Sequence, residues 1–96
     1  MRSLRIDVRL YANLRMTAGT SAESLEVPPA ATVREALERL FDALPALRGE
    51  VLDELGEVRP FVQIFRNGRE IRWQEGLETR LAEGDTLHLF PPIAGG

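Results

Sequence analysis

Apolar and polar residues alternate at the beginning of the chain, which is typical of a β-strand with one buried face. The apolar set is Leu4, Ile6, Val8 and Leu10, and polar side chains occupy the positions between them up to Tyr11. Successive side chains of a strand point to opposite faces, so this pattern predicts a first strand. Residues 24–27 alternate again before Pro28-Pro29, and Gly19-Thr20 indicates a turn, which together predict an antiparallel hairpin with a long loop.

The spacing of apolar residues changes after Pro29 and predicts the main helix. Thr32 and Glu35 have the spacing of a capping box, in which each side chain accepts a hydrogen bond from the other residue's backbone N–H. One apolar stripe then follows at helical spacing, made of Val33, Ala36, Leu37, Leu40, Phe41 and Leu44. Pro45 ends the helix because it blocks continuation. A short, irregular helix is expected within residues 46–58, where glycines interrupt the pattern.

The second half of the chain predicts a hairpin and a final strand. Residues 61–66 and 69–73 flank Asn67-Gly68, a pair that favours a type I′ turn with positive φ at both positions. A brief helical turn is expected at residues 77–81, and residues 83–85 turn the chain into a last strand at 86–90. This order predicts an α+β fold with one helix on one face of a sheet. Its core is expected to contain Ile6, Val8, Leu37, Leu40, Phe41, Ile64 and Leu89.

Length, charge and composition narrow the class of protein. A chain of 96 residues with 44% hydrophobic content is expected to form a single domain over residues 1–96. The N-terminus is interrupted by charges, and no membrane-spanning stretch is found, so we expect a cytoplasmic protein without membrane contact. The net charge of −3 disfavours nucleic acid as the main partner.

The residue types needed for an autonomous enzyme are scarce. The chain has one histidine, His88, and no cysteine, and it lacks a Gly-x-Ser-x-Gly elbow and a phosphate-binding Gly-rich loop. A lone histidine with scattered carboxylates has no recognisable metal-ligand spacing. We therefore expect no metal, no permanently bound cofactor and no catalysis by the chain alone, and we assign His88 to a surface that contacts a partner.

A group of arginines supports a rival hypothesis. Arg66, Arg69 and Arg72 surround the hairpin near Trp73 and Phe65. Basic and aromatic side chains together can bind single-stranded RNA. Charge decoration of two exposed strands is the simpler interpretation, and an RNA surface leaves the end of the chain without a purpose.

The last seven residues, Phe90-Pro91-Pro92-Ile93-Ala94-Gly95-Gly96, have a composition that suggests a specific use. The two prolines lack N–H donors and stop the strand. The six residues after Phe90 can span roughly 20 Å when extended, which is enough to enter a narrow channel. Glycines without Cβ atoms allow the backbone to approach a reactive group closely. On the strand before this tail, Leu87 and Leu89 are expected to point inward, which leaves His88 and Phe90 on the open face.

This ending resembles the C-terminus of the MoaD/ThiS family of ubiquitin-like sulfur carriers, and in particular that of the small subunit of molybdopterin synthase. The order of elements is similar to the ubiquitin-like β-grasp fold. The resemblance implies a mixed sheet of about five strands with strands one and five parallel at its centre. It also places Phe65 on the same face as His88 and Phe90, where the three side chains form the aromatic centre of a partner-binding face. The long segment 45–60 is similar to that of a subset that includes a carrier for cysteine biosynthesis.

The resemblance also implies a chemistry for the end of the chain. An E1-like, MoeB-like adenylyltransferase uses ATP to adenylate the carboxyl group of Gly96, and a sulfur donor enzyme displaces AMP to leave a thiocarboxylate. The tail lies in the partner's channel through Pro91, Pro92, Ile93, Ala94 and Gly95. The acceptor implied is the MoaE-like large subunit of molybdopterin synthase. Cysteine biosynthesis and tRNA thiolation remain alternatives, as does a β-grasp module that binds protein or RNA without carrier chemistry.

Overall fold

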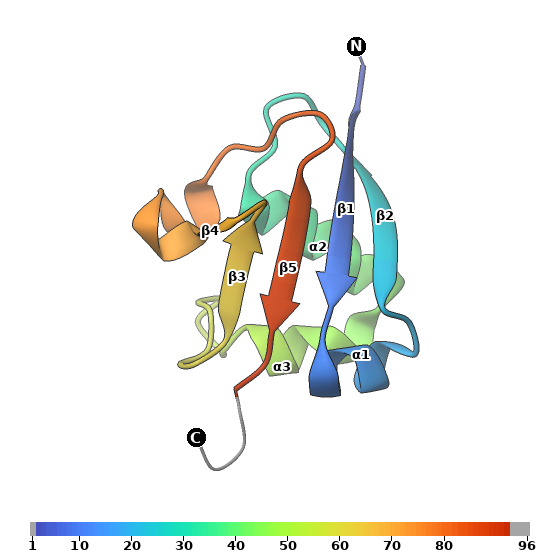
Figure 1. The fold of residues 1–96 in the computed structure, drawn as a ribbon, viewed down its shortest axis with the longest axis vertical. Helices are drawn as coiled ribbons and strands as arrows, with labels where there is room; N and C mark the ends of the chain where they lie inside the picture. Colours follow the sequence, from blue (N-terminus) through green and yellow to red (C-terminus); the bar gives the residue numbers. More distant parts are fainter. Residues whose placement is uncertain (1, 93–96) are drawn as a thin grey trace.

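A five-stranded sheet forms one layer of the protein, and helix α2 covers one of its faces (Figure 1). The computed structural model describes residues 2–92, so the predicted tail residues 93–96 lie outside the described part of the chain. The strand order is β2-β1-β5-β3-β4, and the strands are β1 (Leu4–Leu10), β2 (Ala22–Val27), β3 (Gln63–Arg66), β4 (Arg69–Glu70) and β5 (Thr86–Phe90). Strands β1 and β5 are parallel neighbours inside the sheet, and the other pairs are antiparallel. This mixed sheet is the predicted β-grasp topology.

Helix α2 (Val33–Ala43) begins and ends where its sequence predicts. The capping box is formed: the Glu35 N–H donates to Thr32 Oγ1 over 3.3 Å, and the Thr32 N–H donates to Glu35 Oε1 over 3.2 Å. Two backbone donors of the first turn are thus satisfied by side chains. The apolar stripe faces the sheet, and all of its members are buried except Leu44, which is partly buried at the C-cap.

One hydrophobic core fills the space between α2 and the sheet. All seven residues predicted for it are buried there, and Ile6, Val8, Leu40 and Leu89 have no exposed area. The core is also larger than predicted, because side chains from the connecting segments extend it, among them Leu14, Leu47, Val51 and Ile71. Since apolar burial is the dominant favourable term in folding, these connections stabilise the domain as well as link its elements.

The connection between β1 and β2 is not the loop that the sequence predicts, because it contains helix α1 (Ala12–Ala18). Only Leu14 of this helix is buried, so no apolar periodicity marks it in the sequence. Its end is defined by Gly19, which has φ of 75° and donates its N–H to the carbonyl oxygen of Arg15 over 2.9 Å. Such a left-handed residue after the last turn is a common helix terminator.

The predicted hairpin is shorter than expected at both ends. Strand β3 starts at Gln63 and not at Phe61, and β4 has two residues before the chain enters the 3₁₀ helix η2 (Ile71–Trp73). This turn lets Ile71 reach the core, whereas Trp73 is exposed. The prediction of a type I′ turn is also wrong, because that turn needs positive φ at both central residues. Asn67 has φ of 56°, but Gly68 does not have a positive φ. Asn67 is held instead by three hydrogen bonds to Asp85 and Thr86, so tertiary contacts determine the turn.

The segment between Pro45 and Pro60 contains the irregular helix predicted for it. It forms the 3₁₀ helix η1 (Pro45–Leu47) and the single turn α3 (Arg48–Val51), after which Leu52 and Val58 form an isolated bridge. Leu55, which the helical spacing grouped with the apolar residues of this segment, is 87% exposed. The brief turn expected before β5 is the 3₁₀ helix η3 (Gly76–Glu78). Across residues 2–92, every helix falls short of the length and apolar character needed to cross a membrane.

Candidate functional site: an aromatic face beside the end of the sheet

Strand β5 divides its side chains between the core and the open face of the sheet. Leu87 and Leu89 are completely buried, whereas His88 and Phe90 are partly exposed on the face that α2 does not cover. This division is the one predicted from the period-two alternation. Pro91 and Pro92 follow directly, and β5 ends at Phe90 as predicted.

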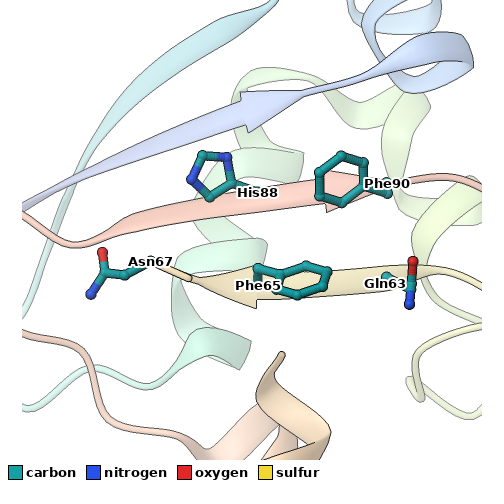
Figure 2. A pocket seen from close by; sticks show the side chains of 5 residues that line it. All are labelled: Gln63, Phe65, Asn67, His88 and Phe90. Carbon is teal, nitrogen blue, oxygen red and sulfur yellow. The ribbon is translucent and has the colours of Figure 1, made fainter. Parts of the chain in front are cut away.

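The neighbouring strand β3 brings Phe65 beside these residues. In the antiparallel register Phe65 is opposite His88, and Gln63 is opposite Phe90. Figure 2 shows the rings of Phe65 and Phe90 on adjacent strands with Gln63 and Asn67 at the two ends. These five residues line an open depression of about 400 Å³. The structure thus brings together the three residues predicted for the partner-binding face.

Tyr11, which follows β1, completes the aromatic group. Its ring stacks on Phe90 with a centroid distance of 4.3 Å and an interplanar angle of 10°, and Phe65 meets Phe90 edge-on at 5.7 Å and 86°. Offset or edge-on contacts between rings each contribute about 0.5–1.5 kcal/mol beyond the buried area. We call Tyr11, Phe65, His88 and Phe90 the aromatic face.

Tyr11 was not among the residues predicted for the partner-binding face, although the alternation of β1 contains a signal for it. Tyr11 continues the outward-facing series of β1, and the parallel register of Leu10 with Leu89 places the next residues, Tyr11 and Phe90, side by side. Only the pairing of β1 with β5 reveals this, because the two residues are far apart in the chain.

A hydrogen bond orients the single histidine. The Tyr11 hydroxyl and Nδ1 of His88 are 2.8 Å apart, and their rings lie 5.9 Å from each other. When the hydroxyl donates to Nδ1, the neutral imidazole carries its proton on Nε2 and offers a donor to a partner. A catalytic base would instead be expected to have an orienting acceptor such as a carboxylate. Within residues 2–92, the bond to Tyr11 is the one hydrogen bond that the His88 side chain makes, so its geometry fits a contact role.

The arginines of the hairpin do not form the basic surface of the RNA hypothesis. Arg66 is only partly exposed and pairs with Asp85 at 2.7 Å, and Arg72 pairs with Glu70 at 2.6 Å. Two of the three positive charges are therefore matched by carboxylates of the same chain, which weakens attraction to phosphates. No group of three or more His, Cys, Asp or Glu side chains in the part of the chain that the structure describes is placed to hold a metal ion.

Asp85 fixes the start of β5 and thereby the position of the aromatic face. Its side chain is 8% exposed and accepts hydrogen bonds from the Ala82 N–H, Arg66 Nε and Asn67 Nδ2 over 2.8, 2.7 and 3.1 Å. Burial acts to raise the pKa of this carboxyl group, but the hydrogen bonds and the charge of Arg66 outweigh burial and hold the pKa below its ordinary value. Asp85 therefore remains ionised at neutral pH and ties β5 to the hairpin.

Comparison with known proteins agrees with the topology of the sheet. The ThiS family model matches residues 8–96. Small archaeal modifier protein 3 of Haloferax volcanii is 34% identical over 97% of this chain and 100% of its own length. Among solved structures, the crystal structure of SAMP1 from Haloferax volcanii has a TM-score of 0.88 at 36% identity and covers 96% of this chain and 99% of that chain. A putative molybdopterin converting factor, subunit 1, from Pyrococcus furiosus has a TM-score of 0.75 at 29% identity and covers 95% and 100% of the two chains.

Proposed function

Because the chain belongs to the ThiS family of ubiquitin-like sulfur carriers, we propose that its carboxyl-terminal Gly96 is activated and carries sulfur as a thiocarboxylate. The observation that supports this proposal best is the extent of the family match, which runs from β1 through the Gly95-Gly96 pair. The aromatic face adds support, because two of its residues, His88 and Phe90, lie on β5 immediately before the residues that lead to Gly96.

The proposed chemistry starts from a group that is inert by itself. A carboxylate is negatively charged and has no good leaving group, so it resists attack by nucleophiles. An E1-like enzyme lets the Gly96 carboxylate attack the α-phosphorus of ATP, which releases pyrophosphate and forms an acyl-adenylate. A sulfur nucleophile delivered by a donor enzyme then attacks the carbonyl carbon, and AMP leaves. The product is a thiocarboxylate at Gly96, and ATP is consumed by the partner and not bound by this chain.

The two parts of the surface have separate tasks in this proposal. The aromatic face binds the partner protein, where stacked rings supply a rigid apolar contact. The residues from Pro92 to Gly96 reach the partner's active centre, since four extended residues beyond Pro92 span about 13 Å. Gly95 and Gly96 suit a narrow channel because they present only backbone. The domain holds the tail, and the partner performs the chemistry.

We propose molybdopterin synthesis as the first destination of the sulfur. The Pyrococcus furiosus structure, whose title names a putative molybdopterin converting factor, supports this choice. In that case a MoaE-like large subunit receives the tail, and the thiocarboxylate sulfur attacks a carbon of the pterin precursor as an oxygen leaving group departs from that carbon. Hydrolysis of the remaining acyl–sulfur bond leaves the sulfur on the pterin and returns the Gly96 carboxylate.

Protein modification is the second candidate, and the name of the Haloferax volcanii relative, a small archaeal modifier protein, favours it. Here an amine of another protein attacks the same activated carbonyl carbon. The amine loses a proton, AMP or the sulfur group leaves, and an isopeptide bond forms. Both candidates begin with an activated Gly96. In the first the sulfur carried by Gly96 is the nucleophile, and in the second the carbonyl carbon of Gly96 is the electrophile.

Intact mass spectrometry tests the proposal directly. The mature C-terminus is determined first, and the protein is then incubated with the cognate E1-like enzyme, ATP and a sulfide source. We expect the wild-type chain to gain the oxygen-to-sulfur mass difference on its C-terminal peptide. Deletion of Gly96 shortens the tail by one residue, about 3.3–3.6 Å. Because reacting atoms must lie roughly 3–3.5 Å apart, the new terminus is too far from its reaction partner, and this variant is expected to gain no mass. Gly95→Val is expected to fail as well, because a branched side chain restricts φ and clashes in a narrow channel.

The same preparation distinguishes molybdopterin synthesis from protein modification. Thiocarboxylated protein is offered to a MoaE-like subunit with a pterin precursor, and in parallel the activated protein is offered to lysine-containing proteins of the same cell extract. Dithiolene formation supports the first destination, and isopeptide-linked peptides support the second. A wild-type chain that no cognate activating enzyme converts, or a natural chain that continues past Gly96 without processing, would refute the carrier proposal.

A further inference from the structure

A second groove, which borders the aromatic depression at Gln63, lies where β5 leaves the sheet. It has a volume of about 630 Å³, and Pro91 and Pro92 form one wall. The opposite wall is the end of the 45–60 connection and the residues after it, including Val58, Pro60 and Phe61.

Phe61 stands at this groove in an unfavourable conformation. Its backbone φ is 69°, and its side chain is 79% exposed. The Val62 N–H donates to the Arg59 carbonyl oxygen over 3.2 Å, so Phe61 is the third residue of a turn with proline in the second position. Proline followed by a residue with positive φ is the signature of a type II turn, which favours glycine at the position that Phe61 occupies. A bulky residue with positive φ is an outlier that points to a role for the side chain.

The turn is anchored firmly, so the ring is held in place. The Arg59 N–H donates to the Val51 carbonyl oxygen over 2.9 Å, and the Arg59 Nε donates to the Gly49 carbonyl oxygen over 2.5 Å. Asp53 accepts backbone N–H bonds from Leu55 and Glu57 in the loop that leads to the turn. These hydrogen bonds fix the segment after α3, which leaves the side chain of Phe61 exposed to solvent.

The groove is continuous with both parts of the proposed site. Gln63 lines this groove and also the depression beside the aromatic face. Because Pro91 and Pro92 form a wall of the groove, a protein that binds the residues directly after Pro92 lies next to the groove. The walls are mainly apolar, and the charged lining residues are Arg59 and Arg72. Arg72 is paired with Glu70 at 2.6 Å, so the positive charge available to an occupant is that of Arg59, which forms no ion pair within residues 2–92. The complementary occupant is an apolar side chain next to an acidic residue.

We propose that this groove is a docking site for the rim of the channel that receives the tail, with Phe61 as its central contact. The inference rests on the proposed function, because it requires a partner that takes up residues 93–96. The occupant is a segment of the E1-like activating enzyme that carries an apolar residue and an acidic residue. Binding at the aromatic face and at the Phe61 groove holds Pro91 and Pro92, where the tail begins, from two sides.

Phe61→Gly tests the inference because glycine is the residue that the turn favours. The expected urea midpoint of this variant equals or exceeds that of the wild type, so weaker binding does not reflect unfolding. We expect its Kd for the cognate activating enzyme, measured by calorimetry without ATP, to rise by about tenfold or more, as for a central interface residue. Met16→Ala is the matched control: Met16 is 77% exposed on α1 and does not line the groove. It should bind like the wild type.

A photo-crosslinking phenylalanine analogue at position 61 supplies a second readout. We expect a covalent adduct whose partner peptide contains both an apolar and an acidic residue. If wild-type protein is activated but Phe61→Gly binds with unchanged Kd, or if Met16→Ala weakens binding equally, the groove is not the docking site and the carrier proposal stands. If wild-type protein is never activated, both proposals fall.

Discussion

Replacement of Asp85 by asparagine is expected to destabilise the fold and to remove part of its acid sensitivity. Oδ2 of Asp85 accepts from the Ala82 N–H and from Arg66, and Oδ1 accepts from the amide nitrogen of Asn67. Asparagine has one oxygen, so one of these donors must face an NH₂ group. Rotation of the Asn67 amide does not resolve this conflict, because its oxygen accepts the Thr86 N–H over 3.0 Å.

The magnitude follows from the contacts that are lost. A buried donor without a partner costs about 1–3 kcal/mol, and a hydrogen bond to a charged group contributes about 1.5–3 kcal/mol. The Arg66 side chain is 28% exposed, so water compensates part of its loss. We therefore expect Asp85→Asn to lower the free energy of unfolding by about 2–4 kcal/mol at pH 7, from a total of about 5–14 kcal/mol for a domain of this length.

The pH dependence has a definite sign. The folded-state pKa of Asp85 is lowered from an unfolded value of 3.8. The stability that its charge contributes is therefore fully present above about pH 4 and is lost as the pH falls through the lower folded-state pKa. Asparagine resembles the protonated carboxyl group, so the difference between wild type and Asp85→Asn should be constant from pH 5 to pH 7 and should shrink below pH 4.

Urea unfolding followed by far-UV circular dichroism measures this difference. The fluorescence of Trp73 is a poor probe, since its side chain is already exposed in the folded protein. With a slope of about 1–2 kcal/mol per molar urea, the midpoint at pH 7 should fall by more than about 1 M. Equal midpoints at pH 7, or a gap of the same size at pH 3 and pH 7, would show that the charge of Asp85 does not tie β5 to the hairpin.

Two further predictions concern the core and the aromatic face. Leu40→Ala should lower the free energy of unfolding by about 2–5 kcal/mol, because it leaves a cavity under α2. The control Leu55→Ala, at an exposed position, should change the free energy of unfolding by less than about 0.5 kcal/mol. Equal urea midpoints for the two variants would contradict the packing of α2. Phe90→Ala should weaken binding to the activating enzyme in calorimetry and leave the fold intact. Tyr11→Phe keeps the stack on Phe90 without the hydroxyl and should bind better than Phe90→Ala; the reverse order would refute a role for the stacked rings.

The sequence alone determined those helices and strands whose apolar spacing or capping residues form a clear local pattern. The Thr32 capping box, the apolar stripe of α2 and the alternation of β1 and β5 each depend on residues within a few positions of one another, so they can be read without the fold. The same alternation placed His88 and Phe90 on the open face. The family resemblance of the Gly95-Gly96 ending predicted membership of the sulfur-carrier family, which the match over residues 8–96 confirms, whereas the role of Gly96 stays a prediction.

Tertiary structure alone decided the features in which distant segments meet. The start of β4 and the turn at Asn67 depend on Asp85 and Thr86. Helix α1 buries one residue, Leu14, so its sequence shows no apolar periodicity that would predict it. Tyr11 joins the aromatic face only because β1 pairs in parallel with β5. The groove at Phe61 likewise needs the end of β5 beside the turn that follows the 45–60 connection. Propensity acts over a few residues, whereas these contacts join positions tens of residues apart, and their energies appear only when the core brings the segments together.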